Sequence, residues 1–295
     1  MSKFVIFADS TCDLDKEMRQ RYDIDYVPMN YVIDEDEYVA SLDWECHSAK
    51  ELYDIMRSGK RVYTTQVPQN AYIEKFKAVL DKGMDVLYIS CSSAMSGSIN
   101  IAKVVIEQLK AEYPDRAICC VDALICSLGQ GHLAIMASLY RAEGHTVEET
   151  AKYIEDNRFF VNQFATVESL EYLRRAGRVT ASSAFFGNLF GVKPIIISDR
   201  IGQNYAIKKV KGAKNAKREI ANLIKEAANG VYDTLYISHA DCIRDAEALR
   251  DEILEIAPFK NVHIGIIGPI VGASVGPGTI IAYCYGNEVT IEGRV

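Results

Sequence analysis

The chain has 295 residues, of which 49% are hydrophobic and 25% charged, as is typical of globular proteins. Its net charge of −7 and the lack of a Lys/Arg block argue against nucleic acid or an anionic membrane as partner. No run approaches 18 apolar residues, so we expect no membrane span. The first ten residues lack a signal-peptide core, and the eight cysteines show neither a CxxC pair nor a zinc-ligand spacing. We therefore expect reduced thiols and a cytoplasmic location.

Buried strands alternate with amphipathic helices over the first half of the chain. The patterns predict strands at 3–8, 26–33, 86–89 and 117–121, an acidic loop at 34–38, and helices from near Leu14, at 48–57, after Pro68, and at 99–109, 126–140 and 146–157. Such alternation is typical of a doubly wound parallel sheet. Small residues along one side of the 126–140 helix allow another chain segment or a ligand to approach closely.

The second half has a different pattern. It predicts strands at 159–166, 234–238, 262–267, 280–285 and 288–291, a hairpin of 192–198 with 205–210, helices at 170–175, 182–190, 213–228 and 243–256, and a glycine-rich turn at 272–279. Hairpins mixed with helices indicate a mixed sheet. Because the chain is long for one core, we predict an α/β protein of two domains: 1–157 with a doubly wound parallel sheet, and 158–295 with a mixed-sheet α+β fold.

A turn crowded with hydroxyl groups joins a predicted strand to a predicted helix at 90–98 (SCSSAMSGS). In a parallel sheet such a turn lies at the carboxyl edge, where ligands bind. A helix N-terminus presents unpaired N–H groups and a partial positive charge, which suit an anion. Ser96 or Ser98 can equally serve as a helix cap, so this turn predicts an anion site, a cap, or both.

A second polar turn, Thr64-Thr65-Gln66, precedes Pro68 and the next predicted helix. Like the serine turn, it follows a strand-like segment and offers hydroxyl and amide groups without charge. Asp9, at the carboxyl end of the first strand, is a further candidate, although its cluster can also cap a helix.

The sequence lacks the motifs that three other functions would need. A serine hydrolase would use Ser93 or Ser96 as nucleophile with His132 or His239 as base, but no GxSxG elbow is present. A nucleotide site would need GxxxxGK[ST] or a complete GxGxxG, and neither occurs. No ligand cluster for a metal is visible.

Six motifs together resemble the DegV family, also called the fatty-acid-binding (FakB-type) subunits of bacterial fatty acid kinase. They stand in the family's order and cover nearly the whole chain: Asp9-Ser10-Thr11, Thr64-Thr65-Gln66, 92–98 (SSAMSGS), 170–179 (LEYLRRAGRV), 191–195 (GVKPI) and 276–279 (GPGT). Each motif alone is weak, whereas all six in order are specific.

The resemblance implies a protein that buries one long-chain fatty acid between its domains. It implies no catalysis and no cofactor, and presentation of the acid to an ATP-dependent kinase subunit that makes the acyl phosphate. Carried over to this chain, the carboxylate-binding residues are Thr64 or Thr65, and Ser96 with the neighbouring Ser93 and the Gly97 amide, together with Ser274. The alternatives are the serine-nucleophile lipid esterase and a lipid carrier or sensor without a kinase partner.

This sequence departs from the family pattern at two places. The family often has a histidine two positions before the GPG turn, and here that position is Ser274, which donates a hydrogen bond but carries no charge. After the hairpin, lysines (Lys208, Lys209, Lys211) stand where the family often has an arginine. For a kinase-presenting protein, Arg175 and Arg178 are the residues expected to face the partner.

An apolar slot for the acyl tail is expected from aromatic and aliphatic residues of the second half. The candidates are Phe159, Phe164, Phe186, Phe190 and Ile266, with Phe160, Phe185 and Leu189 nearby in sequence. Each of them can also belong to the ordinary core.

Overall fold

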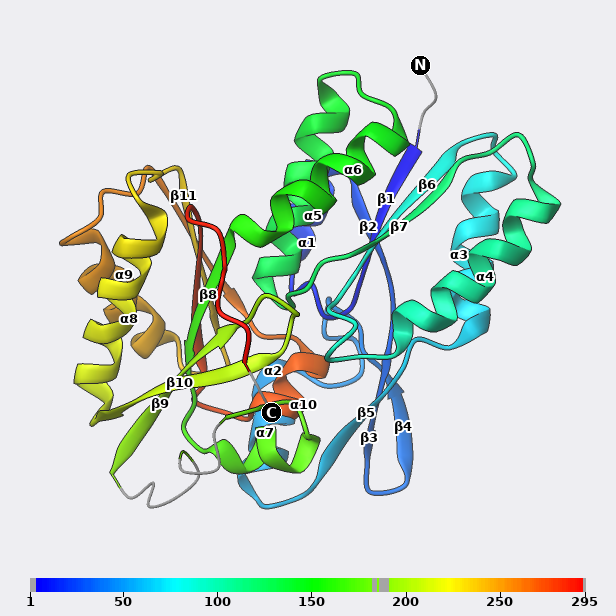
Figure 1. Cartoon of the computed structure of the whole chain (residues 1–295). Coiled ribbons are helices and arrows are strands. Elements are labelled where there is room, and N and C mark those ends of the chain that lie inside the picture. The colour runs from blue at the N-terminus through cyan, green and yellow to red at the C-terminus, as the bar shows by residue number, and fades with distance from the viewer. Residues whose placement is uncertain (1–3, 182–184, 186–190, 294–295) are drawn as a thin grey trace.

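A computed structural model of the chain describes residues 4–181, 185 and 191–293 (Figure 1). The strands are Phe4–Asp9 (β1), Ile24–Val27 (β2), Asn30–Ile33 (β3), Asp36–Val39 (β4), Val62–Thr65 (β5), Asp85–Ser90 (β6), Ile118–Asp122 (β7), Val161–Thr166 (β8), Val192–Ser198 (β9), Asn204–Lys211 (β10), Thr234–His239 (β11), Asn261–Ile266 (β12) and Ile280–Tyr285 (β13). The helices are Lys16–Tyr22 (α1), Ala49–Arg57 (α2), Gln69–Leu80 (α3), Ser98–Glu112 (α4), Leu128–Ala142 (α5), Val147–Asn157 (α6), Leu170–Ala176 (α7), Ala213–Ala228 (α8), Ile243–Leu254 (α9) and Pro269–Val275 (α10), with a 3₁₀ turn at Arg158–Phe160.

The first sheet is parallel, in the order β2-β1-β6-β7. Helices α3 and α4 pack together on one face, and α5 and α6 pack on the other (Figure 1). All six residues of β6 are buried, which is why this strand is a continuous apolar run rather than an alternating pattern. The prediction of a doubly wound parallel sheet is confirmed.

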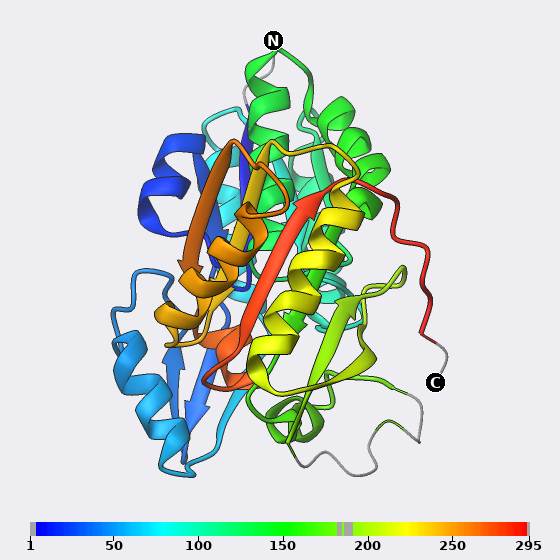
Figure 2. The same ribbon diagram turned by 90° about the vertical axis from the view of Figure 1, so that its left-hand side faces the viewer.

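The second sheet is mixed, in the order β10-β9-β8-β13-β11-β12, with only β11 and β12 parallel. Helices α8 and α9 cover its outer face (Figure 2), and α5 contacts β8 and β11 as well as β1 and β6 of the first sheet. The small residues of α5 permit this double packing. A Cβ at Gly129 would lie 3.0 Å from the Tyr283 ring, and one at Gly131 would lie 2.8 Å from the Cys12 carbonyl.

A third sheet, β4-β3-β5, differs from the sequence prediction. The segment 26–33 was expected to be one extended segment, either an edge strand or irregular because of Pro28. It forms two separate strands on either side of Pro28, which has no N–H to continue a ladder. β2 therefore joins the parallel sheet, while β3 forms a hairpin with β4 where an acidic loop was expected. Helix α10, within the expected glycine-rich turn, packs on β3, β5 and α2. Residues 288–291, expected as a strand, are not in a sheet.

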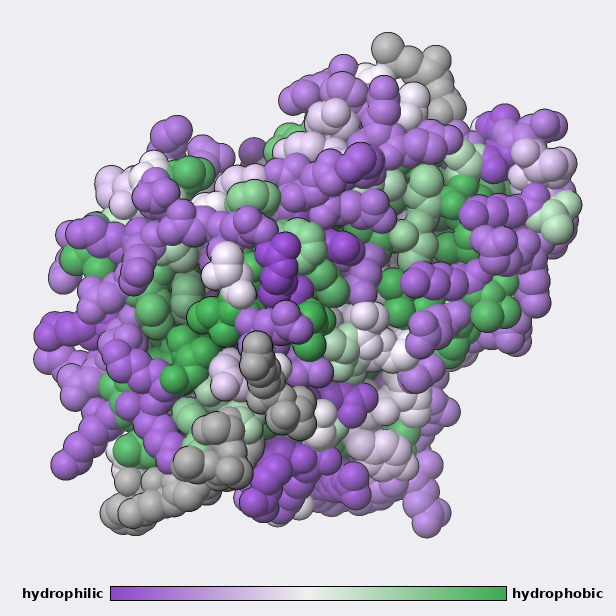
Figure 3. Space-filling view, in the orientation of Figure 1, coloured by the Kyte–Doolittle hydropathy of each residue, from purple (hydrophilic) through white to green (hydrophobic). Residues whose placement is uncertain are grey.

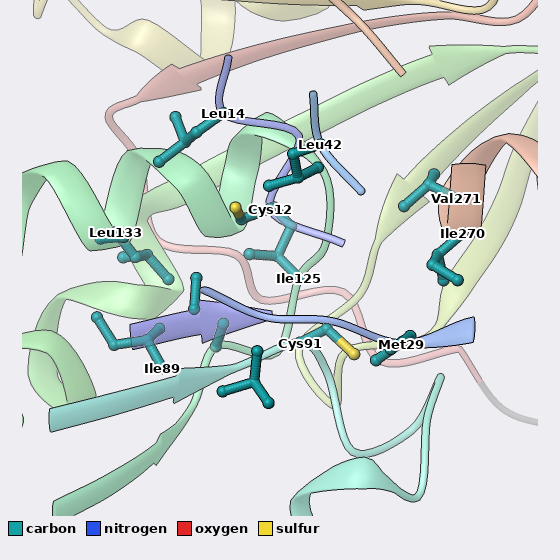
Figure 4. Packing of buried hydrophobic residues seen from close by; sticks show 14 of the residues in the cluster. Cys12, Leu14, Met29, Leu42, Ile89, Cys91, Ile125, Leu133, Ile270 and Val271 are labelled. Atoms are coloured by element: carbon teal, nitrogen blue, oxygen red, sulfur yellow. The ribbon is translucent and has the colours of Figure 1, made fainter. Parts of the chain in front are cut away.

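The second sheet separates two hydrophobic cores, because its side chains alternate between faces. Ala165, Ile196 and Ile281 belong to the core shared with the first half, whereas Phe164 and Ile195 belong to the core under α8 and α9. Figure 4 shows part of the shared core, including residues of α5 and of α10. The four-stranded and three-stranded sheets use residues before 157 and the six-stranded sheet uses residues after 160. The domain division at 157 remains a prediction.

Polar side chains cover most of the face seen in Figure 3. Within the part of the chain that the structure describes, no helix has the length and apolar character needed to cross a membrane.

Candidate functional site

A cavity lies where the serine turn, the end of β5, α10 and the inner face of the second sheet meet; we call it the central cavity. The empty space in it, counted together with its opening to solvent, is about 850 Å³. Its polar lining consists of Thr11, Thr64, Thr65, Gln66, Ser96, Gln163, Arg178, Asn204, Ser274 and Thr279. Its other lining residues are Met29, Cys91, Met95, Gly97, Cys126, Ala165, Val167, Leu173, Ile196, Ile270, Val271, Val275 and Ile281.

Asp9 holds the serine turn in place from beneath the cavity. Its buried carboxylate accepts hydrogen bonds from the Thr11 amide, the Cys91 amide and the Tyr88 hydroxyl, each at 3.0 Å. These bonds join the turn after β1 to the turn after β6. Asp9 does not cap the first helix, because α1 begins at Lys16 and its cap is Asp15. The buried carboxylate therefore organises the site rather than facing a ligand.

Ser96 both caps a helix and lines the central cavity. Its Oγ accepts a hydrogen bond from the Ser98 amide in the first turn of α4 (3.2 Å) and donates one to Ser98 Oγ (3.0 Å). The Val67 amide also donates to Ser98 Oγ (3.1 Å), which fixes the Thr64-Thr65-Gln66 turn beside the serine turn. The two polar turns singled out in the sequence thus meet at one end of the cavity.

Close backbone packing completes this polar end. The Gln66 amide lies against the start of α4, where a Cβ at Gly97 would be 2.4 Å from its nitrogen and would force the Gln66 side chain to move. The Gly97 amide stands at the positive end of that 15-residue helix. This end therefore favours an anionic group.

The two adjacent threonines have different surroundings. Thr65 Oγ1 donates to Glu37 Oε1 (3.1 Å) and is engaged by the three-stranded sheet. Thr64 and Ser274 also line the cavity, and their hydroxyl groups make no hydrogen bond to any other described residue. The hydroxyl groups of Thr64 and Ser274 are therefore best placed to donate to a ligand, and Ser96 beside them can do so by giving up its bond to Ser98 Oγ.

Ser93, expected from the sequence to bind the ligand, does not line the central cavity. It is exposed, and its amide donates to Asp122 Oδ1 (3.1 Å). The neighbouring Ser92 is buried and donates to the Gly202 carbonyl (2.7 Å), which attaches the serine turn to the β9–β10 hairpin. Gly202 has φ +81°, and a Cβ there would collide with Ser92 Oγ.

Three of the residues expected to line the acyl-chain slot, Phe159, Phe164 and Ile266, do not line the central cavity. Phe159 packs beneath the guanidinium groups of Arg158 and Arg200, whose Cζ atoms lie 5.1 and 4.6 Å from its ring centre. Phe164 belongs to the core under α8 and α9, and Ile266 does not line the cavity. Phe186 and Phe190 fall outside the described residues. The wall consists instead of smaller side chains, which the sequence reasoning missed because it favoured aromatic residues. The sequence did hold one signal for this wall: Gln163 and Ala165, on either side of Phe164 in β8, point to the opposite face of the sheet from Phe164.

A second hollow adjoins the polar end of the central cavity; we call it the basic hollow. Lys60, Arg61, Arg175 and Arg178 line it, together with Met56, Val62, Tyr63, Thr64, Tyr172, Ala176, Ala273 and Ser274. Arg178 lines both spaces, and its guanidinium donates to the carbonyls of Met95 and Ala176. Arg175 lines only the basic hollow and forms an ion pair with Glu171. A positive field therefore lies directly outside the hydroxyl groups.

The arrangement does not favour a hydrolase. His132 packs against Tyr236 with ring centres 4.7 Å apart, and burial lowers its pKa to about 4. His239 Nδ1 accepts a hydrogen bond from the Cys242 amide (3.3 Å), and burial lowers the pKa of this histidine too. No histidine is among the described residues that line the central cavity, so neither of the candidate nucleophiles, Ser93 and Ser96, has a histidine base there.

Burial disfavours the thiolate form of the two cysteines that line the cavity, Cys91 and Cys126. Burial raises the pKa of the Cys126 thiol to about 12 and raises that of Cys91 as well. Over residues 4–181, 185 and 191–293, no three His, Cys, Asp or Glu side chains are grouped so as to hold a metal ion.

The geometry defines a protein with a largely apolar cavity that has an anion-compatible end of hydroxyl groups, with Arg178 beside it. A model of the family described as "Uncharacterised protein, DegV family" matches residues 3–285. This chain therefore belongs to the DegV family. A DegV domain-containing protein of Clostridium perfringens is 35% identical over 288 residues, which span 97% of this chain and 99% of the relative.

Solved structures share this fold. One from Thermus thermophilus, described as showing fatty acid binding of a DegV family protein, superposes with a TM-score of 0.87 at 25% identity and covers 97% of this chain and 100% of that one. DegV of Bacillus subtilis, described as a fatty acid binding protein, superposes with a TM-score of 0.83 at 25% identity, with coverage of 97% and 100%.

Proposed function

We propose that this protein binds one long-chain fatty acid in the central cavity, with the carboxylate at the end formed by Thr64, Ser96 and Ser274. The observation that carries the proposal is the meeting of two uncharged hydroxyl-bearing turns at one end of a largely apolar cavity. The fatty acid binding described for the proteins of Thermus thermophilus and Bacillus subtilis supports it.

The energetics favour such a ligand. Burying about 16 carbons at about 0.8 kcal/mol per CH₂ offers on the order of 10 kcal/mol before entropy costs. The head group then needs only hydrogen bonds that offset its desolvation. Hydroxyl groups, the Gly97 amide and the start of α4 supply these bonds, and Arg178 adds a positive charge at the mouth.

We expect native mass spectrometry of the purified full-length protein to show one C14–C18 acid per chain, recovered by solvent extraction. The tail is buried in the cavity, so the acid should survive purification. Delipidated protein should take up hexadecanoic acid at the same stoichiometry. A stoichiometric phosphate compound instead, or hydrolysis of p-nitrophenyl esters that is lost in Ser96→Ala, would contradict the proposal.

The protein itself is proposed to be non-catalytic and to present the carboxylate to an ATP-dependent fatty acid kinase. The basic hollow supports this role, because its cations lie beside the carboxylate end, where a phosphate donor on a partner would approach. Ser274, in place of the family's frequent histidine, supplies a hydrogen bond there but no charge.

Arg175→Ala should lower the kcat/KM of acyl phosphate formation by a purified fatty acid kinase about tenfold, since charges at an interface rim set the rate of encounter. The affinity for hexadecanoic acid should not change, because Arg175 does not line the central cavity. Lys152→Ala is a matched control, since Lys152 forms a similar exposed pair with Asp156 on α6. An equal effect in both variants, or none in Arg175→Ala, would argue against presentation through this face.

A further inference from the structure

The segment 287–293, which we call the strap, follows β13 in an irregular conformation. Figures 1 and 2 show it in red, descending beside the β9–β10 hairpin toward the C label. At its start, the Asn287 amide donates to the Ala227 carbonyl on α8 (2.7 Å). The Val289 amide then donates to the Phe159 carbonyl (2.7 Å). The backbone of the strap is therefore bound to the second half of the chain before it reaches the hairpin.

The far end of the strap is fastened to the turn at 199–203 that joins β9 to β10; we call it the hairpin turn. The buried Asp199 carboxylate shapes this turn, since its Oδ1 accepts hydrogen bonds from two amides of the turn (3.1 and 2.8 Å). Its other oxygen, Oδ2, accepts one from the Gly293 amide (3.0 Å). A Cβ at Gly293 would lie 2.4 Å from the Tyr205 ring, so any larger residue there would push this end of the strap away.

Arg200 fastens the strap to the hairpin turn a second time. Its amide donates to the Ile291 carbonyl (2.8 Å). Its guanidinium donates to the Val289 carbonyl (3.2 Å) and to Glu288 Oε1 (2.5 Å). The strap and the hairpin turn are thus joined by backbone bonds and by two charged side chains.

The same hairpin turn is bound to the first half of the chain on its other side. The Ser92 hydroxyl donates to the Gly202 carbonyl (2.7 Å). The central cavity lies beside this contact, because residues 95–97 of the serine turn line one side of it and Asn204, which follows the hairpin turn, lines the other. The hairpin turn therefore holds together two elements that form the wall of the cavity.

Movement at this seam would give an acid access to the cavity. Most of the described residues that line the central cavity are buried, so part of the wall has to move when a long-chain acid enters or leaves. β9 pairs with β10 along its whole length, whereas the β8–β9 ladder has one registered pair among the described residues, Ala165 with Ile196. The position of the hairpin relative to the first half of the chain therefore depends on the bonds at the hairpin turn.

We propose that the strap is a latch on the central cavity: it holds the hairpin turn against the serine turn, and its release opens the seam through which the acid enters and leaves. This inference rests on the proposed binding of a fatty acid and concerns the exchange of that acid. No residue of the strap is among the described residues that line the cavity. The strap therefore stabilises the closed form equally with and without ligand, so it sets the rates of uptake and release and not the affinity.

Gly293→Val tests the latch, because it acts on the strap alone. Stopped-flow fluorescence of cis-parinaric acid with delipidated full-length protein measures both rates. Uptake and release should each be about tenfold faster than in the wild type, which is the effect of losing one hydrogen bond to a charged group, and the dissociation constant should not change. Glu292→Val is the matched control, since it places the same side chain at the exposed neighbouring position, and it should leave both rates unchanged. Equal rates in the two variants, or faster release alone with weaker binding, would overturn the inference.

Arg200→Gln tests the same latch from the side of the hairpin turn, should Gly293→Val not fold. It removes the guanidinium bonds to the strap and keeps the amide bond to Ile291. Uptake and release should both be about threefold faster, as expected for partly exposed charged contacts. Rates equal to those of the wild type would count against the latch.

Hydrogen–deuterium exchange of the ligand-free protein tests the coupling without any acid. In Gly293→Val, the amides of the hairpin turn and those of the serine turn should both exchange about tenfold faster than in the wild type. Faster exchange confined to the strap and the hairpin turn would overturn the inference and leave the proposed function standing. Failure of the wild type to bind any long-chain acid would overturn the proposed function, and the latch with it.

Discussion

A chain carrying both Thr64→Val and Ser96→Ala should bind hexadecanoic acid about a hundredfold more weakly than the wild type. Thr64→Val removes an unengaged hydroxyl donor from the proposed carboxylate site, and Ser96→Ala removes one that would turn from Ser98 Oγ to the ligand. A hydrogen bond to a charged group contributes about 1.5–3 kcal/mol. Two such bonds therefore correspond to a factor of about a hundred or more in the dissociation constant. Titration of the delipidated variant with the acid measures the effect directly.

Two controls separate binding from folding in this experiment. Ser96 also caps α4 through the Ser98 amide, so the double variant should lose about 1 kcal/mol of stability, which urea unfolding will show. Ser93→Ala removes a hydroxyl of the same turn that lies outside the central cavity, and it should leave the affinity unchanged. Equal losses in Ser93→Ala and the double variant would place the carboxylate elsewhere, as would an unchanged affinity in the latter.

Asp13→Asn should change how the stability of the protein depends on pH. Asp13 is 5% exposed, and its carboxylate accepts from the Ser127 hydroxyl (2.5 Å) and from the Gly268 amide at the start of α10 (2.9 Å). Burial raises its pKa to about 7, against the opposing effect of those two hydrogen bonds and with a small addition from Asp9. This carboxyl group joins the turn after β1 to α5 and α10, and α10 carries Ser274.

The direction of the effect follows from proton linkage. The folded state holds the Asp13 proton more tightly than the unfolded chain, whose carboxyl ionises near pH 3.8. The stabilisation from this group is therefore fully present below about pH 4 and is lost as the pH rises to about 7. A neutral amide at this position does not ionise, so the variant has no such loss.

Urea unfolding of both proteins from pH 4 to 8 measures this difference. The stability of Asp13→Asn relative to the wild type should rise by about 3 kcal/mol between pH 4 and pH 7 and level off by about pH 8. Other carboxyl groups titrate in both proteins and cancel in the comparison. A stability difference that does not vary with pH would mean that folding does not raise the pKa of Asp13.

Much of the fold follows from local patterns in the sequence. Continuous apolar runs such as β6, followed by helical periodicity, indicated the parallel sheet, and the hairpin of β9 and β10 followed from its turn. The break at Pro28 and the helix at α10 were missed. A proline marks an edge or an irregularity without saying which sheet each side joins. The one glycine of α10, Gly272, leaves room for Tyr53, whose hydroxyl would lie 2.5 Å from a Cβ at that position.

The polar end of the candidate site was also accessible from the sequence, whereas its apolar wall was not. Thr64-Thr65-Gln66 and the serine turn follow strands, and the carboxyl ends of parallel strands meet at one edge. Both faces of the second sheet are apolar, because one packs against α8 and α9 and the other lines the cavity. Alternation along β8 separates Gln163 and Ala165 from Phe164, but it cannot say which set faces the ligand. Only the docking of the second sheet against α5 and the serine turn decided that Gln163, rather than Phe164, lines the cavity.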